Sequence, residues 1–217
     1  MRRISEAFLI FVVLMAGAIW WLGDDGSDEA YAEAQEIIAA AVLAKPAVLH
    51  LDKLPNLKTL PPDIATLDRL VMLNLKGTKI SDIDALGRLD RLQILNLRGT
   101  RVTDLEALSG MQNLEILDVG KTWVSDLSPL VELASLKRLD VGDTQLRSLE
   151  PTTRMAALDW INLHGAYAID GSRAHFEMLH STGIQVNNGR AFRENYQPDW
   201  IYRSKIRFQR VRARLGL

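Results

Sequence analysis

The chain of 217 residues contains no cysteine. Disulfide bonds, thiolate metal sites and a cysteine nucleophile are therefore excluded, although this absence fits any cellular compartment. An excess of charge of one sign is also missing, because 26 Lys and Arg residues nearly balance 27 Asp and Glu residues. This balance gives no global argument for nucleic-acid binding. With 47% hydrophobic residues, the chain has enough apolar material for one well-buried domain with appendages.

Motifs typical of enzymes are missing as well. The string Gly120–Thr122 resembles the end of a phosphate-binding loop, but that loop needs a glycine where this chain has Glu115. His175 and His180 do not share a helix face in the way that a zinc-binding pair four residues apart would. No Ser-His-Asp set and no glycosidase-type pair of carboxylates can be picked out. We therefore predict no enzymatic activity, no cofactor and no metal site.

What the sequence has instead is a repeat with a period of 22 residues. Leucines recur at positions 1, 4 and 6 of each block, which is the signature of a repeat solenoid. We predict a short strand over positions 3 to 7 of each block, with positions 4 and 6 buried, and equal registers stack these strands into a parallel sheet. The four regular blocks begin at Leu70, Leu92, Leu114 and Leu136, with a degraded copy from Leu158 and an irregular one over residues 49–67.

Two polar columns of the repeat are assigned structural roles. The threonines of position 9 can bond backbone groups that are left unpaired where the strand turns. The acids of position 13 are placed to cap a short helical turn on the convex side, so they need no calcium ion to explain them. These columns are Thr78, Thr100, Thr122 and Thr144 at position 9, and Asp82, Asp104, Asp126 and Ser148 at position 13.

The repeat resembles the leucine-rich repeat family, and in particular its bacterial internalin-like subclass with 22-residue coils. The residues that carry the resemblance are Leu92, Leu95, Leu97, Val102, Leu105 and Leu108 with their counterparts in the other blocks, over about Leu49 to Leu163. The chain departs from the family pattern by having Thr at position 9, where many repeats carry Asn. The resemblance implies an α/β fold, a right-handed solenoid with a parallel concave sheet and helical caps, and a protein-binding scaffold as its function.

Residues 1–23 contain an uninterrupted apolar run, Ala7 to Leu22, after Arg2 and Arg3. Its length falls between a secretory core of about 7–15 residues and a bilayer span of about 17–25 residues. It therefore fits either an uncleaved anchor or a signal peptide cleaved after the small residues 16–18. Positive charge before the run and acids after it predict an amino end on the inner side of the cytoplasmic membrane and the remainder of the chain outside it. We expect a single-pass inner-membrane protein with its carboxyl-terminal domain in the periplasm or outside, and a secreted protein as the alternative.

The rest of the chain is divided into three parts. Residues 24–46 are predicted to form a linker and an amino-terminal capping helix, capped by Ser27 or Asp28 and ended by Pro46. Residues 47–189 form the solenoid with its carboxyl-terminal cap, which is a helix from Ser172, a stop at Gly183 and a short strand. Residues 190–217 form a basic tail.

Candidate contacts with a partner follow from the alternation of side chains in a strand. Positions 3, 5 and 7 face the concave side, where an exposed apolar column beside an Asn and Asp column is typical of an interface. The alternative is structural, because Asn or Asp is common at position 5 and the position 3 residues partly cover one another. The predicted contacts are Met72, Asn74, Lys76, Ile94, Asn96, Arg98, Ile116, Asp118, Arg138, Asp140, Trp160 and Asn162, with Trp123 on the rim.

The basic tail is a second candidate surface. Its apolar residues fall on one stripe of a helix, so it is expected to lie on an anionic membrane or to dock in an acidic partner, and a solvated, partly disordered tail is the alternative. Its cations are Arg203, Lys205, Arg207, Arg210, Arg212 and Arg214.

These features predict a non-enzymatic scaffold that binds another protein. In one form it is a membrane-tethered accessory subunit of a membrane complex, which contacts the membrane through its amino-terminal helix and its tail and does not bind nucleic acid. The alternative is a secreted or surface recognition module that binds host protein or envelope glycan.

Overall fold

A computed structural model describes residues 25–166, 179 and 181–187 of the chain. Helix α2 (Ser27–Ala44) comes first, and seven short strands follow it. The strands are β1 (Val48–His50), β2 (Met72–Asn74), β3 (Ile94–Asn96), β4 (Ile116–Asp118), β5 (Arg138–Asp140), β6 (Trp160–Asn162) and β7 (Gln185–Asn187). Five 3₁₀ helices lie between them: η1 (Pro62–Thr66), η2 (Asp84–Arg88), η3 (Glu106–Leu108), η4 (Ser128–Leu130) and η5 (Glu150–Arg154).

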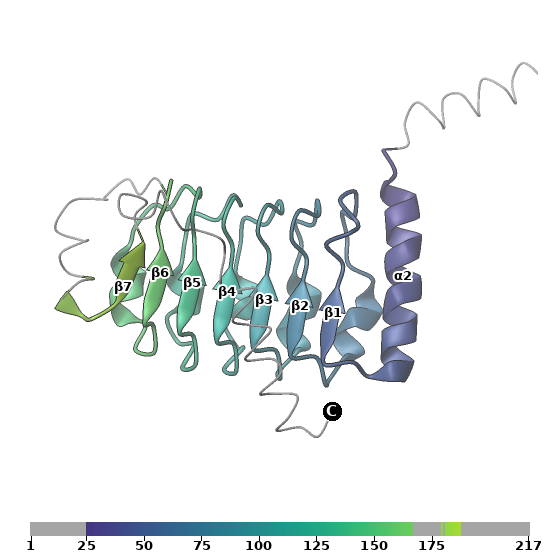
Figure 1. The fold of residues 1–217 in the computed structure, drawn as a ribbon, viewed down its shortest axis with the longest axis horizontal. Coiled ribbons are helices and arrows are strands. Elements are labelled where there is room, and N and C mark those ends of the chain that lie inside the picture. Colours follow the sequence, from purple (N-terminus) through teal and green to yellow (C-terminus); the bar gives the residue numbers. More distant parts are fainter. Residues whose placement is uncertain (1–24, 167–178, 180, 188–217) are drawn as a thin grey trace, which may run out of the picture.

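The seven strands form one parallel sheet in chain order (Figure 1). Met72 pairs with Ile94, and the register continues through Ile116 and Arg138 to Trp160, which confirms the predicted stacking of one coil on the next. Each strand covers only positions 3 to 5, so the prediction of strands over positions 3 to 7 was too long. The chain turns at position 8, where a left-handed residue is required.

The hydrogen bonds between coils nevertheless extend beyond the strands. The Leu75 N–H donates to the Asn96 carbonyl at 2.9 Å, and the Gly77 N–H donates to the Arg98 carbonyl at 2.8 Å. Gly77 has a φ of 74°, a backbone conformation that glycine adopts without steric cost. Positions 6 to 8 therefore stay aligned from coil to coil, and the side chain of position 7 is held at the edge of the sheet face.

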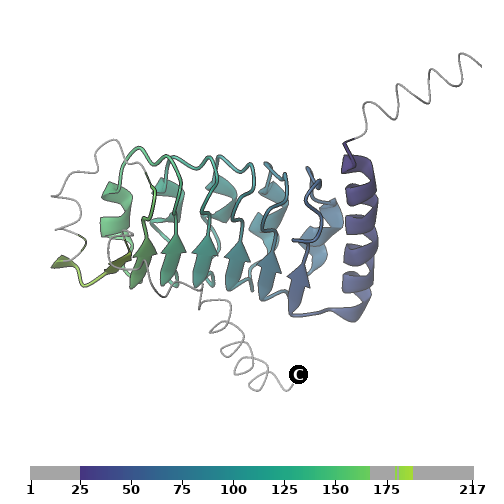
Figure 2. The ribbon, with the colours of Figure 1, turned by 45° about the horizontal axis from the view of Figure 1, so that its top comes forward.

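The core is a continuous column of leucines, isoleucines and valines between the sheet and the 3₁₀ helices. The position 4 residues of the regular coils, such as Leu73 and Leu95, are fully buried, as are those of position 6, such as Leu75 and Leu97. Figure 2 shows the strands on one side of this core and the 3₁₀ helices on the other. The predicted solenoid of leucine-rich coils with a parallel sheet is thus confirmed.

The two polar columns have the predicted structural roles. In the position 9 column, the Thr100 hydroxyl donates to the Leu97 carbonyl at 2.7 Å, and the equivalent bond recurs at the other three threonines. In the position 13 column, Asp104 accepts the Glu106 N–H at 2.7 Å. Asp104 lies one residue before the N-cap residue of η3, Leu105, so its carboxylate stabilises the turn that leads into the 3₁₀ helix.

Helix α2 covers the first coil, as expected for a capping helix. It buries Ala30, Ala34, Ile38 and Ala41, which recur at helical spacing, against the core. The predicted cap by Ser27 or Asp28 was wrong, because the N-cap residue is Gly26, with a φ of 72° and no side-chain cap bond. The helix ends as predicted before Pro46, where left-handed Lys45 donates its N–H to the Ala41 carbonyl.

The start of α2 is tied to the solenoid by charge. Asp25 lies 2.9 Å from the Lys58 ammonium and 3.8 Å from the Lys79 ammonium. The hydrogen bond from Lys58 is the main reason that the pKa of Asp25 falls to about 2. The carboxylate is therefore ionised at neutral pH and links the chain before the helix to two coils.

Several predicted segments fall outside the described residues. They are the apolar segment of residues 1–23, most of the helix from Ser172, and the tail with its six cations. Within residues 25–166 and 181–187, no helix is both long enough and apolar enough to cross a membrane. The predicted strand of the carboxyl-terminal cap is present as β7, which follows Gly183 in a left-handed turn and pairs with β6.

Candidate protein-binding face

The predicted contact residues lie on one face of the sheet. We define the sheet face as the side chains of positions 3, 5 and 7 along strands β2 to β6. The observed registers bring the ten predicted residues of positions 3 and 5 together in two columns that run across the coils. Lys76 and Arg98, at position 7, are aligned by the backbone bonds between their coils. Trp123 lies apart from them at position 10, where its side chain is 60% exposed.

The apolar column of the sheet face is more buried than predicted. Ile94 is 7% exposed and Ile116 is 9% exposed, so an exposed apolar column was wrong for the central coils. Their side chains are covered because residues in register on neighbouring strands lie only about 4.8 Å apart. Met72 and Trp160, near the two ends of the column, remain half-buried. Apolar contact with a partner is therefore available at the ends of the face.

The Asn and Asp column of position 5 serves the backbone. Asn96 accepts the Arg98 N–H at 2.9 Å, and the same bond is made from Asp118 to Gly120 and from Asp140 to Gly142. These side chains thus satisfy the backbone N–H of position 7 within the same coil. The structural interpretation of position 5 is confirmed. Asn74 and Asn162 make the equivalent bond, at 3.2 Å and 3.1 Å.

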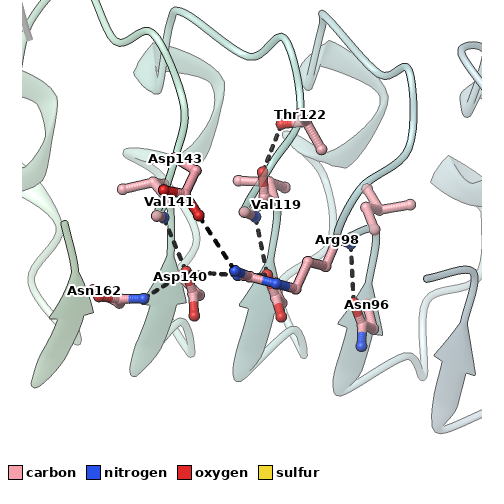
Figure 3. A network of polar contacts seen from close by, with 12 residues as sticks. Asn96, Arg98, Val119, Thr122, Asp140, Val141, Asp143 and Asn162 are labelled. Carbon is pink, nitrogen blue, oxygen red and sulfur yellow. Dashed lines mark hydrogen bonds and ion pairs between the residues drawn. The ribbon is translucent and has the colours of Figure 1, made fainter. Parts of the chain in front are cut away.

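Arg98 is not a free cation at one end of the face. Its guanidinium crosses to the next coils and ion-pairs with Asp118 at 3.6 Å, Asp140 at 3.5 Å and Asp143 at 3.6 Å. Figure 3 shows the Arg98 side chain reaching across the neighbouring strand toward Asp140, with Asn162 donating its amide to Asp140 from the other side. We call Arg98, Asp118, Asp140 and Asp143 the Arg98 cluster.

Glycine at position 7 makes room for this cluster. A Cβ at Gly120 would overlap the Arg98 guanidinium. In the β2 and β3 coils, a charged residue at position 7 is followed by glycine at position 8, whereas the next two coils have the reverse order. Lys121 and Asp143 consequently occupy the left-handed position 8, with φ of 56° and 59°, where a side chain costs about 1–2 kcal/mol.

Sequence reasoning missed the Arg98 cluster, although a signal was present. The blocks NLKGT and NLRGT change to DVGKT and DVGDT in the middle of the repeat. Two changes therefore occur together, from Asn to Asp at position 5 and from a charged residue to glycine at position 7. The first change adds negative charge to the face, and the second clears the space that a cation from the preceding coil fills.

Burial gives Asp118 an unusual acidity. The residue is 3% exposed, and its Oδ2 atom has no hydrogen-bond partner among the described residues. The pKa of Asp118 is raised to about 7, mainly by burial and next by the charge of Asp140, against the Gly120 N–H and Arg98. The net charge of the cluster therefore changes near neutral pH.

The carboxyl-terminal half of the face also holds an aromatic pair. The Arg138 guanidinium lies 4.7 Å from the centroid of the Trp160 ring, within the range of a cation–π contact. The two side chains line a small depression together with Ile116, Asp118 and Asp140. A tryptophan held in place by an arginine beside a hollow is the kind of group that dominates binding energy at protein interfaces.

The residues of the string that resembles a phosphate-binding loop have structural roles in the repeat. Gly120 seats the Arg98 guanidinium, Lys121 occupies the left-handed turn, and Thr122 donates to the Val119 carbonyl. Among the described residues, no group of three or more His, Asp or Glu side chains is arranged to hold a metal ion.

Comparison with known proteins agrees with this architecture. Residues 68–110 match the family model for leucine-rich repeats, in two copies. Among solved structures, the chain is similar to internalin C2 from Listeria monocytogenes, with 28% identity and a TM-score of 0.53, over 61% of this chain and 59% of that one. Internalin F from the same organism aligns with 21% identity and a TM-score of 0.49, over 61% of this chain and 44% of that one. No curated protein matches the chain.

The resemblance to bacterial internalin-like repeat proteins is thus shown by the repeat and by the fold. The chain spans less than two thirds of the length of either internalin. The similarity concerns the solenoid, and the activities of whole internalins do not transfer with it.

Proposed function

We propose that this chain is a non-enzymatic scaffold that binds another protein. The premise is that it is a leucine-rich repeat solenoid of the internalin-like type. The partner contacts the carboxyl-terminal half of the sheet face. The observation that carries the proposal is the Arg138–Trp160 pair, at 4.7 Å, beside the depression that it lines. Tryptophan and arginine are the residue types most enriched at the energetic centres of interfaces.

The surroundings of this pair support the assignment. The Arg98 cluster and the backbone bonds of position 5 fix the neighbouring coils, so the side chains of this face lose little conformational freedom when a partner binds there. Asp143 and His164 are exposed in the β5 and β6 coils, the same coils that carry Arg138 and Trp160, and supply polar groups for a rim. At the other end of the face, Met72 and Lys76 offer an apolar side chain and an exposed cation without a comparable aromatic centre.

Site-specific photocrosslinking in cells tests this proposal. A photoreactive residue at His164, on the sheet face, is compared with one at Glu132, an exposed position that follows η4 on the convex side. We expect a discrete crosslinked species from the first position, weakened about tenfold or more by Trp160→Ala, as for a central contact residue. Equal crosslinking from both positions, or no effect of Trp160→Ala, would show that the partner does not use this face.

We propose further that the scaffold is tethered to the inner membrane as an accessory subunit of a membrane complex. The support is the apolar run of residues 7–22, with Arg2 and Arg3 before it and six acids over residues 24–36 after it. The basic tail gives a second attachment to an anionic surface.

Membrane extraction and the mass of the mature protein test the tether. We expect the intact chain to remain in the membrane until detergent is added. A soluble periplasmic protein that begins at Ile19 would instead establish the secreted recognition module. This outcome would leave the proposed sheet-face contact unaffected.

A further inference from the structure

A groove lies at the edge of the sheet where the strands begin, far from the Arg98 cluster. It has a volume of about 300 Å³ and is lined by Lys45, Ala47, Arg69, Val71, Arg91, Gln93 and Asn113. We call it the edge groove. Figure 2 shows this edge as the one at which α2 ends and the strand arrows start. Three of its lining residues are cations, and none is an acid.

The three cations are regularly placed. Lys45 precedes β1, Arg69 precedes β2 and Arg91 precedes β3, so successive coils each contribute one positive charge. Neighbouring strands are about 4.8 Å apart, and the row therefore spans about 10 Å. At the far end of the groove, the Asn113 amide donates to the Asp90 carbonyl at 2.8 Å, which holds that wall in place.

These cations make no ion pair in the described part of the chain. Lys45, Arg69 and Arg91 are exposed, and no ion pair joins them to a described carboxylate. Lys58 and Lys79, by contrast, share Asp25. Three exposed like charges in one groove repel each other, and an anion that neutralises them removes this cost.

An apolar surface adjoins the groove. A second hollow of about 180 Å³ shares Lys45 and Arg69 and is lined also by Val42, Pro46, Thr66, Leu67 and Asp68. Val42 is 36% exposed and Leu43 is 86% exposed at the end of α2. Together with Trp123, they are the exposed large hydrophobic residues of the described chain. The hollow that shares Lys45 and Arg69 thus offers the Val42 side chain at the α2 end of the cationic row, with Asp68 also in its lining.

We propose that the edge groove binds a short acidic segment of a partner protein, with a large apolar residue next to its acids. An extended segment of about four residues spans the row, and the carboxylates of its alternate residues face the row of Lys45, Arg69 and Arg91. The apolar residue contacts Val42 and Leu43, beyond Lys45. This surface is separate from the proposed contact on the sheet face, and neither requires the other.

Charge and shape disfavour other occupants. The basic tail of this chain carries the same sign of charge as the groove and is repelled by it. Attraction to anionic lipid typically uses clusters of about 4–8 cations, whereas the groove has three, and they line a hollow. Nucleic-acid binding likewise requires contacts to many phosphates for useful affinity at physiological salt.

Fluorescence anisotropy with the full-length protein tests the proposal. The probe is a labelled peptide of alternating Glu and Asp that ends in Leu, and the control peptide has Gln and Asn in place of the acids. The variant Lys45→Glu/Arg69→Glu/Arg91→Glu is compared with Lys53→Glu/Arg88→Glu/Arg101→Glu, which has the same net charge and changes exposed cations elsewhere. We expect the groove variant to lose about tenfold or more in affinity, since each exposed ion pair contributes about two- to fivefold.

The matched control separates the groove from general electrostatics. It should weaken binding by no more than about twofold, and the Gln and Asn peptide should not bind. Leu43→Ser should weaken binding only of a peptide that ends in Leu, and not of one that ends in Ser. Circular dichroism of each variant verifies the fold.

Three results would overturn the proposal. One is absence of peptide binding, and another is equal loss in the groove variant and its control. The third is that binding to vesicles of phosphatidylcholine and phosphatidylserine depends on the three cations, whereas peptide binding does not. This result would assign the groove to lipid. Each of these leaves the crosslink at His164 as a separate result.

Discussion

Two arginines on either side of β3 have opposite surroundings. Arg98, just after the strand, contacts three carboxylates across the next two coils. Arg91, just before the strand, lines the edge groove without an ion pair to any described carboxylate. The comparison shows that the type of a charged residue does not define its role. A charge that is neutralised within the fold stabilises it, and a charge left unpaired in a groove is available to a partner.

Charge reversal in the Arg98 cluster should have the largest effect. Arg98→Glu places a fourth carboxylate beside three others, two of which are almost fully buried. We expect the free energy of unfolding to fall by about 3 kcal/mol or more in urea denaturation at pH 8. Lys76→Glu, at the same repeat position one coil earlier but exposed, should cost about 0.5 kcal/mol or less. Equal losses would mean that the cluster does not stabilise the fold.

Gly120→Ala should have the next largest effect, of about 2 kcal/mol. The added Cβ displaces the Arg98 guanidinium, so the cost comes from carboxylates left without their cation. The effect should largely vanish when Arg98→Gln is already present, which a double-mutant cycle measures. Gly110→Ala is the control, because a Cβ there meets nothing within 4 Å. Additive losses would separate Gly120 from Arg98.

Asp118→Asn should stabilise the protein at neutral pH by about 1–2 kcal/mol. The folded pKa of about 7 lies above the ordinary aspartate value of 3.8, so the folded state keeps a proton that the unfolded state has lost. The contribution of Asp118 to wild-type stability therefore falls as pH rises from about 4 to 7 and levels off above that. The advantage of the variant should grow over the same window, which thermal or urea unfolding at a series of pH values measures. Parallel pH profiles of the two proteins would refute this assignment.

Lys121→Gly should have a smaller stabilising effect, of about 0.5–1 kcal/mol. It removes a side chain from a left-handed backbone position with a φ of 56°. Asp143→Gly relieves the same strain but loses the contact with Arg98, so its gain should be smaller or absent. A larger gain from Asp143→Gly than from Lys121→Gly, by differential scanning calorimetry, would show that Asp143 contributes nothing to the cluster.

The period of the sequence predicted the sheet, because a backbone turn at a fixed interval determines which side chains share a column. Met72 and Ile94 lie in register for this reason, and the threonine and aspartate columns behave as expected. The same reasoning could not place Arg98, whose long side chain reaches Asp140 two coils away. The repeat period treats position 7 as equivalent in every coil, although Gly120 leaves space there for the Arg98 guanidinium.

Strand alternation also says nothing about the loops. The edge groove is built from residues such as Arg69 and Arg91, which lie just before strands, and their grouping depends on how the chain enters each coil. The burial of Ile94 and Ile116 likewise depends on contact between neighbouring coils, which a single repeat does not reveal. Partner-binding surfaces are for this reason harder to predict than the scaffold that carries them.

The difference between the two arginines beside β3 can be measured directly. Arg98→Gln and Arg91→Gln remove the same charge from positions in the same region of the solenoid. Urea denaturation at pH 8 should show a loss of about 2–3 kcal/mol for Arg98→Gln, because buried carboxylates lose their cation. It should show a change within about 0.5 kcal/mol for Arg91→Gln, an exposed residue without an ion pair to a described carboxylate. Equal changes, or a larger loss for Arg91→Gln, would contradict the division between a structural cluster and an open binding groove.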